Sequence, residues 1–288
     1  MFRRLGQVII FTAACGNSPR QPPPAVEVAP PVATLPAPYH PTSFSVDVAG
    51  HGRAVILIPG LGCPGSVWDE TVVHFGGRFE THVLTLAGFA GQPPIAAPLL
   101  ATAREELARY IRDRKLDHPI VIGHSLGGFL AYWLAETDPE LVDRLIVVDA
   151  APAISGEIKP GSAKSVTDIW RNDSDADFAR DARQFFSSMA DNKAKLEPVI
   201  VAVARSDKRT FADAVDELNA IDLRPDLGKI RAPTFVVLAE DATYPGVVAT
   251  QIAAIPNHQQ VTLANTKHFV FFDDPTAFFR AVDDFLAR

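Results

Sequence analysis

The stretch Val121–Trp133, VIGHSLGGFLAYW, places Ser125 between two glycines, where β-branched residues give way to a helix-compatible run. Residues 123–127 follow the pattern G-x-S-x-G, in which small neighbours permit a sharp strand-to-helix turn with strained backbone angles. The β-branched residues 120–122 precede this turn, and the run 129–136 follows it. Such a turn lifts the serine hydroxyl out of a sheet edge and directs a helix N-terminus at it. The stretch therefore predicts that Ser125 is a nucleophile, with a structural serine as the alternative.

From about Ser43 the chain alternates short apolar runs with amphipathic segments. Amphipathic segments such as Leu99–Arg114 and Pro275–Arg288 can supply the crossover helices that parallel strands require. The sequence therefore predicts an α/β fold with a mostly parallel sheet covered by helices on both faces. Six continuous apolar runs predict strands buried on both faces: Arg53–Gly60, Thr81–Gly88, His118–Ser125, Asp143–Ala150, Ala232–Asp241 and His258–Asn265.

One long interval of the chain contains no convincing strand. Residues of about 152–225 form polar and helical stretches, which predict a helical cap inserted after a strand. Insertions at the carboxyl ends of parallel strands lie over the ligand site of open α/β sheets. A peripheral helical decoration is the alternative. Five large apolar side chains favour a packing face of the cap itself over a wall of the substrate site: Trp170, Phe178, Phe185, Phe186 and Met189.

The first 42 residues do not share this alternation. Residues 1–15 run from two arginines through an apolar stretch to small residues and Cys15, which is the order of an export signal. The layout resembles a bacterial lipoprotein signal, in which Cys15 is the lipidated residue, although Thr12 stands where such signals usually carry an aliphatic residue. Residues 16–42 are rich in proline and predict an extended linker. We therefore expect an exported protein, membrane-anchored or periplasmic, with a domain over residues 43–288; a cytoplasmic protein is the alternative.

Composition limits the remaining function classes. The net charge of −7 argues against an electrostatic nucleic-acid binder. Two cysteines are too few for a disulfide framework, so Cys63 is expected to be a free thiol if Cys15 is lipidated. The eight histidines show no metal-ligand spacing, so no metal site is expected.

A serine nucleophile needs a base within hydrogen-bond reach, and a carboxylate that orients the base. The candidate base is His268, in NTKHFVFFDDP, which follows the last predicted strand and precedes the last predicted helix. His124 is adjacent to Ser125 but cannot easily reach back to its hydroxyl. We expect His124 to be a packing residue.

With these motifs in order, the chain from about Ser43 to Arg288 resembles the α/β-hydrolase superfamily. The resemblance implies a catalytic triad of Ser125, Asp241 and His268 in chain order, and no cofactor. The segments that carry it are LIPGLGCPGSVWD, LTLAGFAGQ, VIGHSLGG, LIVVDAAP, FVVLAED and HFVFFDDP.

The acid of this triad has three candidates. Family members usually show Gly-x-x-Asp after the strand that carries the acid, and this chain lacks that glycine. Asp241 is the first choice because it ends a predicted strand. Glu240 is the register-shifted alternative, and Asp149 is the second, because some members recruit the acid from the preceding strand.

The resemblance also implies an oxyanion hole made of two backbone N–H groups, those of Leu61 and Leu126. The family commonly carries His-Gly before the first of these positions, whereas this chain carries Pro59-Gly60. Because the donor is a backbone amide, this change need not cost activity.

Together these features predict acyl transfer through a covalent acyl-enzyme, with hydrolysis of a small carboxylic ester as the first expectation. A serine nucleophile argues against epoxide hydrolases and haloalkane dehalogenases, which use aspartate there. A lactonase, a C–C hydrolase, a cofactor-free haloperoxidase and an acyltransferase stay open. A non-catalytic exported binding protein is the alternative from another class. The sequence does not indicate an oligomeric state.

Overall fold

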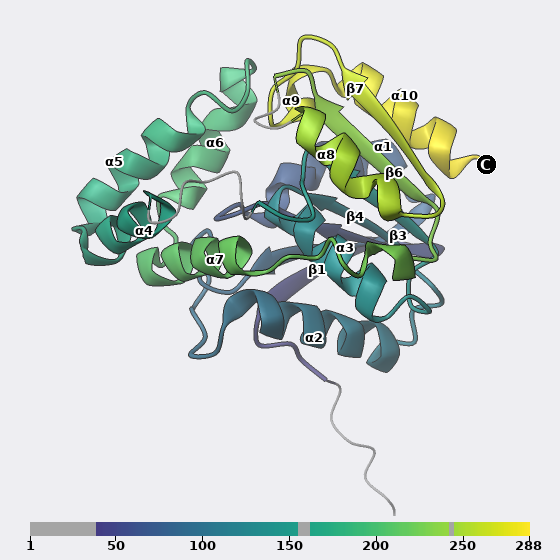
Figure 1. The fold of residues 1–288 in the computed structure, drawn as a ribbon, viewed down its shortest axis with the longest axis horizontal. Coiled ribbons are helices and arrows are strands. Elements are labelled where there is room, and N and C mark those ends of the chain that lie inside the picture. The colour runs from purple at the N-terminus through teal and green to yellow at the C-terminus, as the bar shows by residue number, and fades with distance from the viewer. Residues whose placement is uncertain (1–38, 155–161, 242–244) are drawn as a thin grey trace, which may run out of the picture. The chain divides into compact units, whose positions relative to one another are not determined.

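A computed structural model describes residues 39–154, 162–241 and 245–288 (Figure 1). Within these residues the strands form a seven-stranded sheet in the order β1-β3-β2-β4-β5-β6-β7. Strand β1 pairs with β3 in antiparallel fashion, and the other neighbours pair in parallel. The strands are β1 (Phe44–Gly50), β2 (Arg53–Ile58), β3 (Phe79–Leu86), β4 (Ile120–His124), β5 (Arg144–Val148), β6 (Thr234–Ala239) and β7 (His258–Leu263).

The sheet confirms the predicted α/β class and the positions of all six predicted strands. The expected burial on both faces is wrong for β7, because this strand lies at the sheet edge and only Leu263 of it is buried. Strands β4 and β6 are buried at every residue, as their continuous apolar runs predict for strands covered on both faces. The sequence did not predict β1. That strand lies at the sheet edge with most of its residues exposed, so it lacks a continuous apolar run.

Helices flank this sheet (Figure 1). Helices α2 and α3 contact each other, while α1 and α10 are joined by the stacked rings of His74 and Phe279. The helices outside the cap region are α1 (Asp69–Phe75), α2 (Leu99–Asp113), α3 (Leu126–Thr137), α8 (Pro245–Gln251), α9 (Val270–Asp273) and α10 (Pro275–Leu286), with short 3-10 turns η1 (Gly65–Trp68), η2 (Leu227–Lys229) and η3 (Ile252–Ala254).

Four further helices lie between β5 and β6, within the interval predicted as a cap. Helix α4 packs on α7, and α5 packs on α6. Figure 1 shows them gathered at one side of the sheet, where α7 contacts α2. Residues 155–161 of the predicted interval lie outside the described residues. The four helices are α4 (Ser162–Asn172), α5 (Asp175–Phe186), α6 (Lys193–Val203) and α7 (Lys208–Ala220).

Glu217 of α7 ties this helical segment to the sheet domain. Its carboxylate accepts hydrogen bonds from the first amides of α2: Leu99 N–H at 2.8 Å, Leu100 N–H at 3.1 Å and Ala101 N–H at 3.4 Å. The N-cap residue of α2 is Pro98, which supplies no side-chain cap. Glu217 therefore satisfies amides that have no partner inside their own helix.

The start of β1 is held by a carboxylate of α2. Glu106 accepts hydrogen bonds from the backbone N–H groups of Thr42 and Ser43 and from both of their hydroxyls. The export signal, Cys15 and most of the linker predicted from the sequence precede this point and lie outside the described residues. Among the described helices, none is long and apolar enough to cross a membrane.

Candidate active site

Ser125 lies on a tight turn between β4 and α3, with φ 54° and ψ −122°. The two glycines of the G-x-S-x-G pattern are required by close backbone contacts around this turn. A Cβ atom on Gly123 would lie 2.1 Å from the carbonyl oxygen of Gly127, and one on Gly127 would lie 2.2 Å from the carbonyl oxygen of Ile58. No side chain fits at either position. The turn that the sequence predicts at Ser125 is therefore present, and its geometry explains the pattern.

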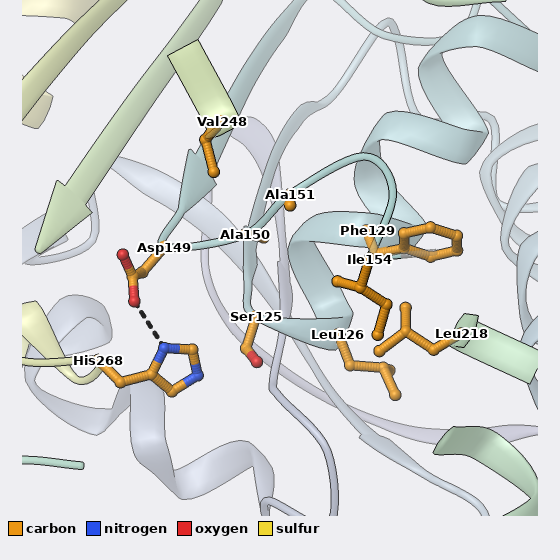
Figure 2. A pocket seen from close by; sticks show the side chains of 10 residues that line it. All are labelled: Ser125, Leu126, Phe129, Asp149, Ala150, Ala151, Ile154, Leu218, Val248 and His268. Atoms are coloured by element: carbon orange, nitrogen blue, oxygen red, sulfur yellow. Dashed lines mark hydrogen bonds and ion pairs between the residues drawn. The ribbon is translucent and has the colours of Figure 1, made fainter. Parts of the chain in front are cut away.

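His268 lies between β7 and α9, on a loop that brings its ring beside Ser125. Its Nδ1 is 2.6 Å from Oδ2 of Asp149. Because a carboxylate oxygen accepts, Nδ1 carries the proton and Nε2 is left as the acceptor. Figure 2 shows the His268 ring between Asp149 and Ser125, and all three residues line one pocket. An imidazole oriented by a carboxylate is what a serine nucleophile requires of its base.

The structure corrects the first-choice acid. Asp241 does not contact His268: its residue is exposed, and its backbone N–H donates to Thr266 O at 3.2 Å. Glu240 instead accepts a hydrogen bond from the backbone N–H of Asn265 at 2.8 Å. The partner of His268 is Asp149, the second alternative from the sequence.

Two strands hold the Asp149 side chain. Asp149 follows β5 with φ 46°, and its backbone N–H donates to Val237 O of β6. Its Oδ1 accepts a hydrogen bond from Ala239 N–H at 3.0 Å, and only 5% of the side chain is exposed. The carboxylate is thus fixed on one oxygen and presents the other to His268. The missing glycine of the Gly-x-x-Asp pattern was the sequence signal that the acid lies elsewhere.

The two candidate oxyanion donors belong to Leu61 and Leu126, which line the larger cavity together with Ser125. Leu126 is the first residue of α3, so its N–H has no partner inside the helix. Leu61 lies on the turn after β2, and Gly60 before it approaches closely enough that an added Cβ would lie 3.2 Å from Ser125 Cβ. Within the described residues, neither N–H donates to another protein group. Both amides therefore remain available to a substrate oxygen.

His124 is fully buried against the His268 loop. Its Nε2 lies 2.9 Å from the carbonyl oxygen of His268 and must donate, because a carbonyl only accepts. Burial, with a further contribution from nearby His268, holds the pKa of His124 well below its ordinary value. The ring also packs against Phe269, with centroids 4.7 Å apart. His124 is the packing residue that the sequence predicts, and it also fixes the backbone of the candidate base.

Within the described residues, two cavities meet at Ser125. The larger has a volume of about 800 Å³ and lies between the turn after β2 and the cap helices. Four of the five apolar cap side chains line it: Trp170, Phe185, Phe186 and Met189. Phe178 packs as the sequence predicted, buried against Phe211, and Trp170 and Phe186 are also buried in the core. The preference for a packing face over a cavity wall is therefore confirmed only in part, because Trp170 and Phe186 both pack in the core and line the larger cavity.

The smaller cavity has a volume of about 130 Å³. Figure 2 shows Ser125 between the His268–Asp149 pair and the apolar side chains of this cavity. The residues that line it are Ser125, Leu126, Phe129, Asp149, Ala150, Ala151, Ile154, Leu218, Val248 and His268.

The other reactive side chains near Ser125 supply neither a metal site nor a second good nucleophile within the described residues. Among residues 39–154, 162–241 and 245–288, no group of three or more His, Cys, Asp or Glu side chains could hold a metal ion. Cys63 borders the larger cavity, but it is 1% exposed, and burial raises the pKa of its thiol. A thiol with a raised pKa is a poor nucleophile, so Ser125 is the candidate nucleophile of this site.

Comparison with known proteins adds to this geometry. Residues 55–281 match the model of the alpha/beta hydrolase family. A curated relative, the pimeloyl-[acyl-carrier protein] methyl ester esterase of Vibrio vulnificus (strain YJ016), is 24% identical over 247 residues, which cover 82% of this chain and 95% of the relative.

Solved structures share the same fold. An esterase from Exiguobacterium antarcticum has a TM-score of 0.76 at 17% identity, and an enol-lactonase from Burkholderia xenovorans LB400 has a TM-score of 0.73 at 20% identity. Each match covers 85% of this chain and 96% of the solved chain. At these identities the likeness concerns the fold.

Proposed function

Since the chain belongs to the alpha/beta hydrolase family, we propose that this enzyme hydrolyses small carboxylic esters through an acyl-enzyme on Ser125. The observation that carries the proposal is the 2.6 Å hydrogen bond between His268 Nδ1 and Asp149 Oδ2. This bond fixes the tautomer in which Nε2 can take the proton of Ser125. The triad proposed here is therefore Ser125, His268 and Asp149.

Acylation begins when Ser125 Oγ attacks the ester carbonyl carbon and His268 Nε2 takes its proton. The buried Asp149 carboxylate stabilises the imidazolium that forms. The N–H groups of Leu61 and Leu126 donate to the oxyanion, and each such donor typically lowers the barrier by about 3 kcal/mol. His268 then returns the proton to the alcohol oxygen, and the alcohol leaves.

Deacylation repeats these roles with water. His268 Nε2 takes a proton from water as its oxygen attacks the acyl carbon of the ester on Ser125. The same backbone N–H groups hold the second tetrahedral oxyanion. The proton returns to Ser125 Oγ when the carboxylic acid is released, and the enzyme is regenerated.

The lining of the larger cavity favours substrates with an apolar acyl group. Its aromatic and aliphatic walls provide the lining that pockets use for apolar ligands. The curated relatives are named as methyl ester esterases, which favours methyl esters of medium-length acids as the first substrates to test.

The test is hydrolysis of methyl esters of increasing acyl length, followed by titration of the acid released. We expect the wild-type enzyme to release acid, and Ser125→Ala to lose roughly 10⁴-fold or more of the rate, because the nucleophile is gone. A phosphonate that reacts with activated serines should label the wild type and leave the Ser125→Ala variant unlabelled.

The same experiment separates the alternatives. Equal acid release by the wild type and the variant would contradict the proposal. A wild type that neither releases acid nor reacts with the phosphonate would favour a non-catalytic binding protein. Ester formation when an alcohol is added, with no acid in water alone, would favour an acyltransferase.

The proposal extends to the cellular location. Residues 1–15 have the layout of an export signal ending at Cys15, and the described domain begins after a proline-rich segment. We propose that a lipid on Cys15 anchors the enzyme to a membrane. Of the predicted linker, residues 16–42, the part before Tyr39 would be the spacer, because Tyr39 and Thr42 contact α2.

A further inference from the structure

The two cavities that meet at Ser125 differ about sixfold in volume, roughly 800 Å³ against roughly 130 Å³. Both are bordered by Ser125, Leu126 and His268. An ester carbonyl carbon bound to Ser125 carries two substituents, the acyl chain and the alkoxy group. Each of the two cavities beside Ser125 can therefore hold one substituent. The volume of the cavity limits the size of the substituent that it holds.

The volumes and the oxyanion donor Leu61 indicate which substituent belongs in which cavity. His268 borders both cavities, so its Nε2 can give the alkoxy oxygen the proton it needs to leave from either one. Leu61 lines only the larger cavity, so the carbonyl oxygen lies toward that side. The larger cavity also has the greater volume, which leaves room there for the acyl chain and leaves the smaller cavity for the alkoxy group.

We propose that the smaller cavity is the alcohol site, and that its walls restrict the leaving alcohol to a short alkyl chain. This inference rests on the proposed esterase function. A protein cavity of about 150 Å³ can bind benzene, so a cavity of about 130 Å³ has room for a substituent of comparable or smaller size. Val248, Ala150 and Ala151 set its size, and Val248 is 4% exposed, so it has little room to move aside.

The smaller cavity also receives the water that is needed for deacylation. Once the alcohol has left this cavity, water must enter the vacated space beside His268. An alcohol short enough to fit can take the place of water and form a new ester, with its proton passing to His268 Nε2 and then to Ser125 Oγ. Methanol is therefore expected to compete with water for the acyl-enzyme, and hexanol is not.

Two ester series measure the two cavities separately. One series keeps a hexanoyl group and lengthens the alcohol from methyl to hexyl; the other keeps the methyl group and lengthens the acid. Crowding a packed site typically costs about 1–3 kcal/mol, so we expect kcat/KM to fall about tenfold or more between methyl and hexyl hexanoate. Lengthening the acid over the same range should not lower kcat/KM.

A matched pair of variants tests whether the smaller cavity determines the preference for short alcohols. Val248→Ala enlarges the smaller cavity, and we expect it to raise the ratio of kcat/KM for butyl over methyl hexanoate about tenfold. Val215→Ala makes the same change in the wall of the larger cavity alone, and we expect it to change acyl preference and leave that ratio unchanged. Ala151→Val narrows the smaller cavity and should lower the ratio, which provides a second test if Val248→Ala folds poorly.

The outcomes separate this inference from the esterase proposal. If the wild type releases no more acid than Ser125→Ala, the esterase function itself fails. If the wild type hydrolyses both series but tolerates long alcohols, or if Val248→Ala changes acyl preference instead of alcohol preference, the assignment of the smaller cavity is overturned while the esterase function stands.

Discussion

At the scale of single residues, the two oxygens of Asp149 have separate partners. One accepts the backbone N–H of Ala239, and the other accepts Nδ1–H of His268. A carboxylate held from both sides cannot rotate away from the imidazole. The tautomer of His268 is therefore set by a group that is itself fixed to β6.

Asp149→Asn tests this arrangement. The amide keeps an acceptor for Ala239 N–H but turns an N–H₂ group toward His268, so the ring must take the wrong tautomer. We expect kcat for a methyl ester to fall on the order of 10³–10⁴-fold. Asp241→Asn is the matched control because Asp241 lines the larger cavity without contacting His268, and its kcat should change by less than about threefold. Equal losses in the two variants would contradict the role of Asp149.

The sequence predicts the site unevenly for a physical reason. The turn at Ser125 is local, because strand, glycines and helix are contiguous, and His268 follows from its position between the last strand and the last helix. The acid depends on which strand end faces His268 across the sheet. Asp149, Glu240 and Asp241 all end predicted strands, and the hydrogen bond between His268 and Asp149 distinguishes them in the structure.

At the scale of elements, α3 carries a carboxyl group in an apolar setting. The helix is buried along most of its length, and Glu136 near its end is 6% exposed. Its Oε2 has no hydrogen-bond partner within the described residues. Burial, and to a smaller extent the Asp226 carboxylate, raise the pKa of Glu136 to about 8.

This raised pKa predicts a stability that falls as pH rises. Between its ordinary value of 4.5 and about 8, Glu136 keeps its proton in the folded state and loses it in the unfolded state. The unfolded state then binds fewer protons, so the free energy of unfolding decreases with pH across this window. Glu136→Gln removes the effect, and we expect its Tm relative to wild type to be higher at pH 9 than at pH 5 by on the order of 5 °C.

Thermal unfolding at the two pH values checks this prediction. Glu105→Gln on α2 is the control, because the Glu105 side chain is 69% exposed and its loss should shift Tm equally at both pH values. The same pH dependence in wild type and Glu136→Gln would show that another group is responsible.

Elements differ in how far the sequence determines them. Strands β2 and β4 to β6 are predictable because burial on both faces requires a continuous apolar run, whereas β1 needs only partial burial and has no such run. The apolar spacing on α4 and α5 predicts an inward face. This spacing does not indicate whether the inward face packs against another cap helix or lines the larger cavity. Trp170 does both.

At the scale of the whole molecule, the proposed anchor and the catalytic domain meet at residues 39–43. Glu106 holds Thr42 and Ser43 there, and the Arg109 guanidinium lies 3.9 Å from the centre of the Tyr39 ring. The domain therefore begins at a fixed point on α2.

Cys15→Ala tests the anchor itself. Without the thiol no lipid can be attached, so we expect most of the protein to move from the membrane fraction to the soluble fraction, with its esterase activity per molecule unchanged. Cys63→Ala is the matched control, because Cys63 is buried in the catalytic domain and should leave the partitioning unchanged. Partitioning of Cys15→Ala that matches the wild type would rule out lipidation at this residue.

Ser125 and Asp149 also share a strained backbone conformation, and this strain has a consequence for how the sequence evolves. Both have positive φ, 54° and 46°, where glycine is relaxed and a side chain costs about 1–3 kcal/mol. A descendant that kept this fold only to bind ligands would gain stability by drifting to glycine at both turns. The strained backbone thus lowers the stability of the fold, and it is kept only where selection maintains catalysis. Among homologues, glycine at these two positions should mark the lineages in which catalysis was abandoned.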